Sequence, residues 1–235
     1  MDNVPLFEAY NLVKCYVPNT PPALAVNLVF PAGKIIGLLG PNGSGKTTLL
    51  KMAAGILQPT SGTLRIAGHE IGTETKAMVS YLPERNALPN WMTVTEVLSY
   101  YEDLFADFDR NRAIEMLDRL QLPAGKRIQT LSKGMKEKVQ LVLVMSRRAR
   151  LYLLDEPIGG VDPATRDYIL ETILANHSPD STILISTHLI ADIEQVLEEF
   201  IFVQHGRLLR YGSVADVHEK EGKTVDALFR EVFRC

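Results

Sequence analysis

This chain carries the stretch Gly40-Pro41-Asn42-Gly43-Ser44-Gly45-Lys46-Thr47, which decides its fold class. The stretch fits the pattern G-x-x-x-x-G-K-[ST], in which glycines let backbone N–H groups turn toward phosphate oxygens. The apolar segment 34–39 before it predicts a strand, and the segment 46–54 after it predicts a helix. Because a helix N-terminus attracts anions, the stretch predicts a phosphate-binding loop between a strand and a helix.

Three side chains at the end of this loop have distinct expected roles. Lys46 is expected to reach the β- and γ-phosphates of a nucleotide, and Thr47 to hold Mg²⁺. Thr48 is placed to hydrogen-bond the α-phosphate. The alternative is a glycine-rich turn with an exposed lysine. This interpretation is the weaker one, because a strand precedes the loop and a helix follows it.

The rest of the chain predicts an α/β fold that is interrupted by helices. Further strands are expected over 7–16, 23–30, 63–67, 78–82, 151–154 and 181–186, with a hairpin formed by 200–203 and 208–211. Outside the middle of the chain, one helix is expected to begin at Asp162-Pro163 and a second to run over 189–199. A short third helix is expected to begin at 213–216. The length of 235 residues suits one large α/β domain, 1–235, or two small ones.

The middle of the chain, residues 87–148, predicts a helical block. A capping box at Thr93–Glu96 opens a helix that runs to about Leu104. Asp109 caps a second helix, whose residues Ile114, Leu117 and Leu120 are expected on one face. A third helix is expected over 132–148. The resulting division is a nucleotide-binding core of 1–86 and 149–212, the helical block 87–148, and a helical tail 213–235.

Four further motifs follow the phosphate loop in a fixed order. They are Leu131-Ser132-Lys133-Gly134-Met135, Leu151-Tyr152-Leu153-Leu154-Asp155-Glu156-Pro157, Gly160-Val161-Asp162 and Thr187-His188. This ordered set resembles the ATP-binding cassette (ABC) ATPase family, and the resemblance covers nearly the whole chain. It implies a P-loop NTPase (RecA-like) core with an N-terminal antiparallel β subdomain and an inserted α-helical subdomain.

The resemblance also implies a role for each motif residue. Asp155 would help to hold Mg²⁺, Glu156 would polarise the attacking water, and His188 would contact the γ-phosphate. Asp162 would lie in a loop that crosses a dimer, and it is also a good N-cap before Pro163. Tyr16 matches the aromatic residue that stacks on adenine. The alternative for Tyr16 is packing within a strand, and the alternative for His188 is a structural cap.

The chain departs from the family pattern at two places. The signature is usually Leu-Ser-Gly-Gly-Gln, and it carries Lys133 and Met135 here. Ser132 and Gly134 keep the hydroxyl and the close backbone approach that a γ-phosphate of a second subunit needs. Glu84 stands where the family usually has glutamine; it can still accept a hydrogen bond from Mg²⁺-bound water, or it can be an exposed loop carboxylate. With both departures, the chain is similar to a bacterial exporter-like branch of the family, which includes antibiotic and peptide efflux systems.

The implied function is that of an ATPase subunit of an ABC transporter, which binds ATP and Mg²⁺. Its implied partners are a polytopic membrane permease and a second copy of itself or a paralogous ATPase, at the cytoplasmic face of the cell membrane. A non-transport ABC ATPase, an ATP-binding module without turnover and a small-molecule kinase are the alternatives.

Composition agrees with this interpretation. The net charge of −3 does not suggest a basic nucleic-acid face, and the basic residues Arg147, Arg148 and Arg150 are expected to meet a helix C-terminus. Cys15 and Cys235 show no metal or redox spacing and are expected to be free thiols. We expect no signal peptide and no membrane helix, since prolines break the longest uncharged stretch, 15–33.

A short loop after Glu84 carries the chain's single tryptophan, Trp91, together with Leu88, Pro89 and Met92. Apolar residues in such a loop either pack under the helical block or face a partner. The resemblance implies a nearby groove that receives a short helix of the membrane subunit, and it favours docking for Trp91.

Overall fold

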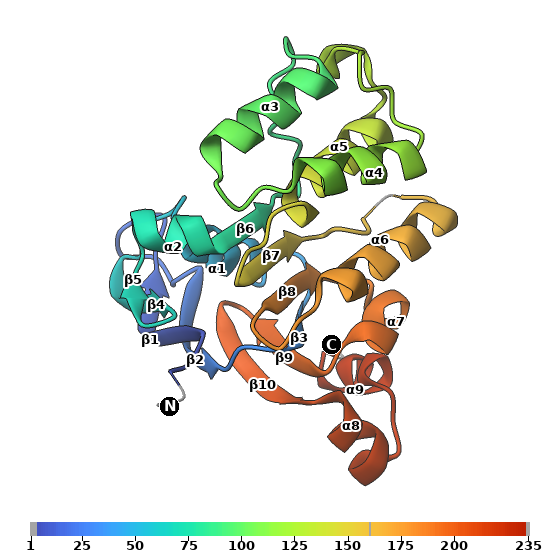
Figure 1. The fold of residues 1–235 in the computed structure, drawn as a ribbon. Helices are drawn as coiled ribbons and strands as arrows, with labels where there is room; N and C mark the ends of the chain where they lie inside the picture. The colour runs from blue at the N-terminus through green and yellow to red at the C-terminus, as the bar shows by residue number, and fades with distance from the viewer. Residues whose placement is uncertain (1–3, 160, 234–235) are drawn as a thin grey trace.

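The computed structural model describes residues 4–159 and 161–233, and its strands form two sheets within those ranges. The first is antiparallel, in the order β2-β1-β4-β5, and the second has the order β10-β9-β3-β8-β7-β6 (Figure 1). In the second sheet, β9, β3, β8, β7 and β6 are parallel and β10 is antiparallel to β9. The strands are β1 Phe7–Lys14, β2 Leu24–Phe30, β3 Ile35–Leu39, β4 Ser61–Ile66, β5 His69–Glu70, β6 Val79–Leu82, β7 Leu151–Asp155, β8 Thr182–Thr187, β9 Glu199–Gln204 and β10 Arg207–Ser213.

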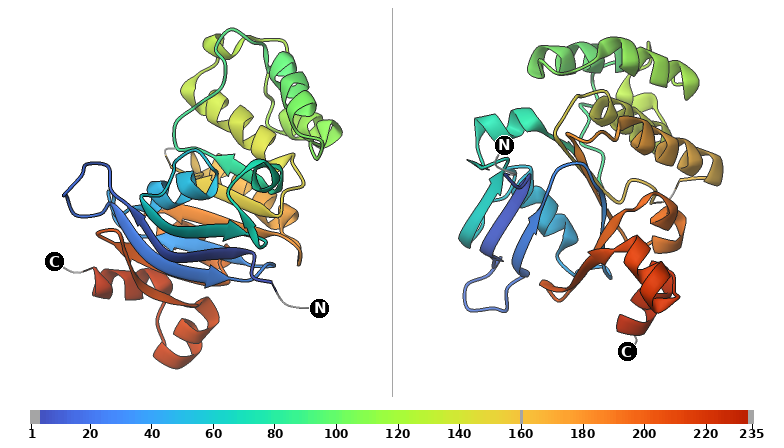
Figure 2. Two further views of the ribbon diagram at one scale, coloured as in Figure 1. Left: turned by 90° about the vertical axis from the view of Figure 1, so that its left-hand side faces the viewer. Right: turned by 60° about the horizontal axis from the view of Figure 1, so that its bottom comes forward.

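The helices cover the second sheet and extend beyond it. They are α1 Lys46–Ala53, α2 Thr73–Met78, α3 Val94–Leu104, α4 Arg110–Arg119, α5 Lys133–Met145, α6 Pro163–Asn176, α7 Ile190–Ile193, α8 Val214–Asp216 and α9 Val225–Val232. Short 3₁₀ turns occupy Ile128–Thr130 and Glu194–Val196, and a π turn occupies Val217–Glu221. In both views of Figure 2 the helical block α3–α5 and the C-terminal helices lie at opposite ends of the molecule.

Side-chain alternation along the parallel strands builds two cores. Leu151 and Leu153 of β7 face one core, together with α1 and the antiparallel sheet. Tyr152 and Leu154 face the other core, together with the helical block and α6. Successive strand residues point to opposite faces, so a strand that is buried on both faces reads as continuously apolar. Helix α1 therefore lies between the two sheets, and the predicted α/β fold with an antiparallel subdomain and a helical insert is confirmed.

The capping residues set where the helices of the block begin. The Thr93 hydroxyl accepts from the Glu96 backbone N–H at 3.2 Å, and the Glu96 carboxylate accepts from the Thr93 N–H at 2.7 Å. This reciprocal pair opens α3 at the residue that the sequence predicts. In α4 the prediction that Ile114 shares a buried face with Leu117 is wrong, since Ile114 is 41% exposed. The buried face is formed by Ala113, Met116 and Leu117, because the helix packs through an i, i+3, i+4 stripe.

Two other expectations are corrected by the structure. The helix expected over 189–199 is limited to α7 and a 3₁₀ turn, because β9 begins at Glu199 and pairs there with β3. Helix α5 ends at Met145, so Arg147 does not meet a helix dipole. Its buried guanidinium instead contacts the carboxylate of Asp107 at 3.0 Å and lies 3.9 Å from the Phe105 ring centroid.

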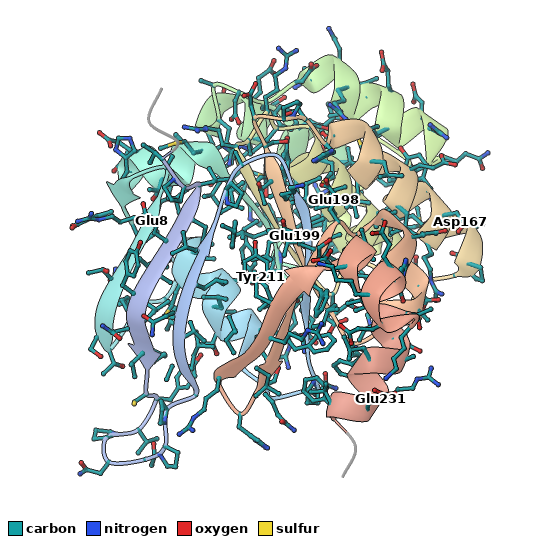
Figure 3. All side chains as sticks on the ribbon, turned by 90° about the horizontal axis from the view of Figure 1, so that it is seen from below. Glu8, Asp167, Glu198, Glu199, Tyr211 and Glu231 are labelled. Carbon is teal, nitrogen blue, oxygen red and sulfur yellow. The ribbon has the colours of Figure 1, made fainter. Side chains whose placement is uncertain are left out.

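The C-terminal part is a hairpin followed by short helices. The β9–β10 hairpin turns at His205-Gly206, both with positive φ, as a two-residue hairpin turn requires. Across the hairpin the Tyr211 hydroxyl donates to the carboxylate of Glu199, and both residues are labelled in Figure 3. Within the described ranges no helix has the length and apolar character needed to cross a membrane.

Candidate functional site

The phosphate loop occupies the turn between β3 and α1. Gly45 caps α1 with φ 107°, and no side chain caps this helix end, so its backbone N–H groups face the loop. A Cβ at Gly45 would lie 2.7 Å from the backbone oxygen of Ala23. Only glycine combines this left-handed conformation with so close an approach of the backbone. The loop thus has the uncapped helix terminus and the backbone turn that bind phosphate.

Lys46 is buried inside the loop rather than extended into solvent. Its Nζ donates to the backbone oxygens of Gly40 at 2.7 Å and Pro41 at 3.2 Å. Burial lowers the pKa of Lys46, and the nearby carboxylates Glu156, Asp155 and Glu84 oppose that shift. The ammonium group is therefore a preplaced cation in a cluster of carboxylates, which suits it to offset phosphate charge.

Asp155 lies at the carboxyl end of β7, beside the end of β8. Its Oδ1 accepts from Thr47 Oγ1 at 3.1 Å and from the hydroxyl of Ser186. Its Oδ2 is buried and has no hydrogen-bond partner among the described residues. Burial raises the pKa of Asp155, while the two hydroxyl groups act in the opposite direction. A buried carboxylate oxygen without a partner, next to a threonine hydroxyl, is a suitable ligand for a divalent cation.

Glu156 follows in a strained conformation that presents its carboxylate to the same region. Its φ is 51°, in the left-handed region that residues other than glycine rarely adopt. Thr187 Oγ1 donates to Glu156 Oε2 at 3.0 Å, and His188 Nδ1 lies 3.0 Å from Glu156 Oε1. The end of β8 therefore fixes both oxygens of this carboxylate, and such strain is common at functional sites.

Tyr16 lies across the mouth of the loop. Its ring is exposed, and its hydroxyl lies 3.1 Å from Thr48 Oγ1. Tyr16 and Thr48 line a cavity of about 410 Å³ together with Glu84 and Glu156. The remaining lining residues are Ala23, Asn42, Gly43, Ser44, Gly45, Lys46 and Thr47. This volume is within the usual range for small-molecule sites, and the cavity is lined by both an aromatic ring and the phosphate loop.

Glu84 is brought to this site from the loop after β6. Besides the main cavity, it lines a small neighbouring one together with Asp155 and Glu156. Its charge contributes to the raised pKa of Asp155 and opposes the lowering of the pKa of Lys46. The structure thus places Glu84 near both the cation and the carboxylates, as a residue of the metal shell would be.

The signature residues lie away from the site. Ser132 caps α5 by accepting from the Met135 N–H at 3.3 Å, and a Cβ at Gly134 would meet nothing within 4 Å. The Lys133 side chain is 90% exposed, and Met135 packs partly against the core. None of these residues is among those that line the 410 Å³ cavity in the described part of the chain.

Asp162 is the N-cap of α6. Its carboxylate accepts from the backbone N–H of Thr165 at 3.0 Å and from its hydroxyl at 2.6 Å, and these two bonds lower its pKa. Gly160, from the same motif, lies outside the described residues, as does Cys235. Among the described residues, Cys15 forms no disulfide bond.

The two hydroxyl groups of β8, Ser186 and Thr187, received no role from the sequence, although Thr187 belongs to the Thr187-His188 motif. They follow an apolar strand and precede His188, so a polar pair at the end of a buried strand was the available signal. Their partners, Asp155 and Glu156, lie at the end of β7 and directly after it, and only the order of strands in the sheet brings the four together.

The described residues contain no group of three or more His, Cys, Asp or Glu side chains that could hold a metal ion alone. Magnesium is usually bound through one or two carboxylates together with substrate phosphates. Thr47, Asp155 and Glu84 fit that pattern, with the phosphate loop supplying the position of the phosphates.

Residues 24–159 match the family described as "ABC transporter". The uncharacterised ABC transporter ATP-binding protein sll0415 of Synechocystis is 34% identical over 200 residues, which are 82% of this chain and 56% of that protein. The ABC transporter ATP-binding protein YtrB of Bacillus subtilis is 33% identical over 198 residues, 83% of this chain and 68% of that protein. The linearmycin resistance ATP-binding protein LnrL of the same organism is 28% identical over 225 residues, 92% of this chain and 72% of that protein. This chain thus spans between 56% and 72% of the length of these relatives.

Two solved structures have the same fold. The structure of an ATP-binding subunit of an ABC transporter is 28% identical, with a TM-score of 0.86 over 97% of this chain and all of that one. A bacterial Atm1-family ABC exporter with ATP bound is 23% identical, with a TM-score of 0.80 over all of this chain and 43% of that one; this second likeness concerns the fold alone.

Proposed function

Because this chain belongs to the ABC transporter family, we propose that it binds ATP with Mg²⁺ and hydrolyses it to drive a separate membrane subunit. The observation that carries the proposal is the grouping of Lys46, Thr47 and Glu156 around one cavity. Asp155 joins this group through its hydrogen bond with Thr47, and Thr187 and His188 hold the Glu156 carboxylate. Steady-state phosphate release by the purified chain tests it.

Hydrolysis needs positioning and charge stabilisation at this site rather than a covalent intermediate. Lys46 and the loop N–H groups bind the terminal phosphates, and Tyr16 offers its ring to the adenine. Bound Mg²⁺ would supply charge neutralisation on the phosphates, held by Thr47 and Asp155. Glu156 orients and polarises the attacking water, and His188 keeps the Glu156 carboxylate in place beside the γ-phosphate position.

We propose that two ATPase chains work together. The signature residues lie outside the cavity of their own chain, while Lys133 is exposed at the start of α5. A second copy, or a paralogous ATPase, would bring Ser132, Lys133 and Gly134 to the γ-phosphate of this chain, and Asp162 would lie in the loop between the two. Met135, which packs partly against the core, would come to the same ATP but cannot make the hydrogen bonds of the glutamine that is usual at its position.

We propose that the transporter is an exporter, with this chain at the cytoplasmic face of the membrane. Lys133 in the signature and Glu84 in place of glutamine support that assignment, and the name of LnrL links one relative to linearmycin resistance.

If Glu84 belongs to the metal shell, its two variants should differ. Glu84→Ala removes a hydrogen-bond acceptor for a charged group, which is worth about 1.5–3 kcal/mol, so turnover should fall roughly tenfold or more. Glu84→Gln keeps an acceptor oxygen, so we expect turnover near the wild-type value with a changed Mg²⁺ dependence. Turnover measured against Mg²⁺ concentration checks both variants.

An alanine variant with wild-type turnover and wild-type Mg²⁺ dependence would instead leave Glu84 as an ordinary exposed carboxylate. Arg85→Ala, in the same loop, is the matched control, and we expect it to leave the Mg²⁺ dependence unchanged.

The loop after Glu84 divides in the structure. Leu88 is buried and Met92 packs against the core, whereas Trp91 is 68% exposed. Core packing is therefore excluded for Trp91. Docking of Trp91 on a membrane subunit stays a hypothesis.

A second apolar surface lies at the opposite end of α3. A groove of about 290 Å³ there is lined mainly by apolar and aromatic side chains, among them Ile56, Tyr81, Tyr101 and Phe105. Ile56 is 63% exposed beside it and Leu104 is 53% exposed. We propose that a short helix of the membrane subunit docks in this groove, because it lies between the nucleotide-binding core and the helical block, which we propose to move as the unit 87–148.

An apolar anchor at the centre of an interface is typically worth about 2 kcal/mol, so Ile56→Ser should weaken assembly with the membrane subunit about 30-fold. Because Ile56 is exposed, the melting temperature of the isolated Ile56→Ser variant should match that of the wild type. Co-purification and a binding titration measure the effect, with Leu174→Ala, an exposed leucine on α6, as the control.

Trp91→Ala belongs in the same assay. If it abolishes assembly while Ile56→Ser does not, the groove proposal is wrong and the docking surface is the loop that carries Trp91.

A further inference from the structure

One buried polar side chain in α5 is not explained by packing. Gln140 stands in the otherwise apolar run Val139–Met145, and it is 4% exposed. Burying an amide group is unfavourable unless its hydrogen bonds are satisfied. Its partners therefore show what the side chain does.

Both ends of the Gln140 amide bind the segment that carries Glu84. Nε2 donates to the Pro83 backbone oxygen at 3.2 Å, and Oε1 accepts from the Ala87 backbone N–H at 3.1 Å. These two backbone groups lie on either side of Glu84 in the chain. The amide thus closes the Glu84 loop against α5.

Other polar contacts between the helical block and the segment that contains β6 hold the strand β6 rather than the Glu84 loop. Ser80 Oγ donates to the Val144 backbone oxygen at 2.9 Å, and Arg147 donates to the Val79 backbone oxygen at 2.6 Å. Among the described residues, both side-chain hydrogen bonds between α5 and segment 83–87 come from Gln140. Removing them would free the loop while β6 stays attached.

Helix α5 begins with the signature, and Gln140 lies seven residues after Lys133, or about two helical turns. We propose that Gln140 is a positioning residue for Glu84, which makes the place of Glu84 beside the phosphate loop depend on the place of α5. This inference rests on the proposed ATPase function. Its consequence is that a shift of the signature helix changes the Mg²⁺ response of the chain's own site.

The test compares Gln140→Met with Ser80→Ala in the purified full chain, and the readout is the Mg²⁺ concentration that gives half-maximal ATP binding in a titration, together with the one that gives half-maximal phosphate release. Methionine has nearly the same shape as glutamine but lacks the amide, and Ser80→Ala removes a hydrogen bond from the same interface without touching the loop. We expect Gln140→Met to shift the half-maximal concentration at least about threefold and Ser80→Ala to leave it unchanged. Equal responses of the two variants would overturn the proposal.

Each substitution is also made in the Glu84→Ala background. If Gln140 acts through Glu84, Gln140→Met has no further effect on the Mg²⁺ response there, because coupled residues are not additive. A full additional shift in that background contradicts the proposal and leaves Gln140 with a structural role.

Ala87→Pro covers the case in which Gln140→Met does not fold. It removes one of the two hydrogen bonds from the exposed loop side and leaves α5 intact. A shift in the same direction supports the proposal, and an unchanged Mg²⁺ response contradicts it. Absence of phosphate release by the wild type, even with its membrane subunit present, would contradict the proposed function instead.

Discussion

Replacing Lys46 by alanine should reduce ATP turnover by about 10²–10³-fold, the loss usually seen when one preorganised charge-stabilising group is removed. Lys46 is the single side-chain cation of the loop, and its ammonium group is already buried among the loop carbonyl oxygens. ATP binding should weaken as well, since the phosphates lose a direct ion pair. Phosphate release and a nucleotide-binding titration measure the two effects.

Lys51→Ala is the matched control, because Lys51 lies in the last turn of the same helix. We expect it to keep turnover and ATP binding. If Lys46→Ala hydrolyses ATP at the wild-type rate, the assignment of the phosphate loop is wrong, whatever the other residues do.

Replacing Glu156 by glutamine should stop hydrolysis while ATP remains bound. The amide keeps the shape of the side chain and can still meet Thr187 and His188, but it cannot polarise water as a base, an effect worth about 10²–10⁴-fold. ATP should then accumulate in the closed pair of subunits, which light scattering detects as a doubled mass. Asp167→Asn is the control, since Asp167 lies on the outer side of α6 (Figure 3).

Normal turnover in Glu156→Gln would remove Glu156 from its proposed role. A mass that stays that of one chain with ATP, even when the membrane subunit is present, would contradict the pairing of two ATPase chains.

The local parts of the fold were predictable because the signals lie within a few residues. The capping box at Thr93–Glu96 and the Asp162-Pro163 start of α6 needed only near neighbours in the chain. The two-residue strand β5 and the six-residue helix α2 were missed, since each is too short to show a period. Ile114 was misplaced because spacing alone does not say which stripe of a helix meets its neighbour.

The site divides in the same way. The phosphate loop is one continuous segment, so its residues could be named from the chain alone. The contacts of Ser186, Thr187 and Gln140 join segments between 31 and 57 residues apart, and no local pattern contains them. The roles of Glu84 and the signature residues stay predictions, because they depend on a bound nucleotide and on a second chain.

Phosphate release from Mg²⁺-ATP by the wild-type chain and by Glu156→Gln, side by side at saturating ATP, tests whether this chain is an ATPase that acts through Glu156. We predict steady release by the wild type and at least about a hundredfold less by Glu156→Gln, with ATP bound equally by both. Equal release by the two proteins, or none by the wild type even with its membrane subunit, would contradict the assignment of this chain as an ATPase that acts through Glu156.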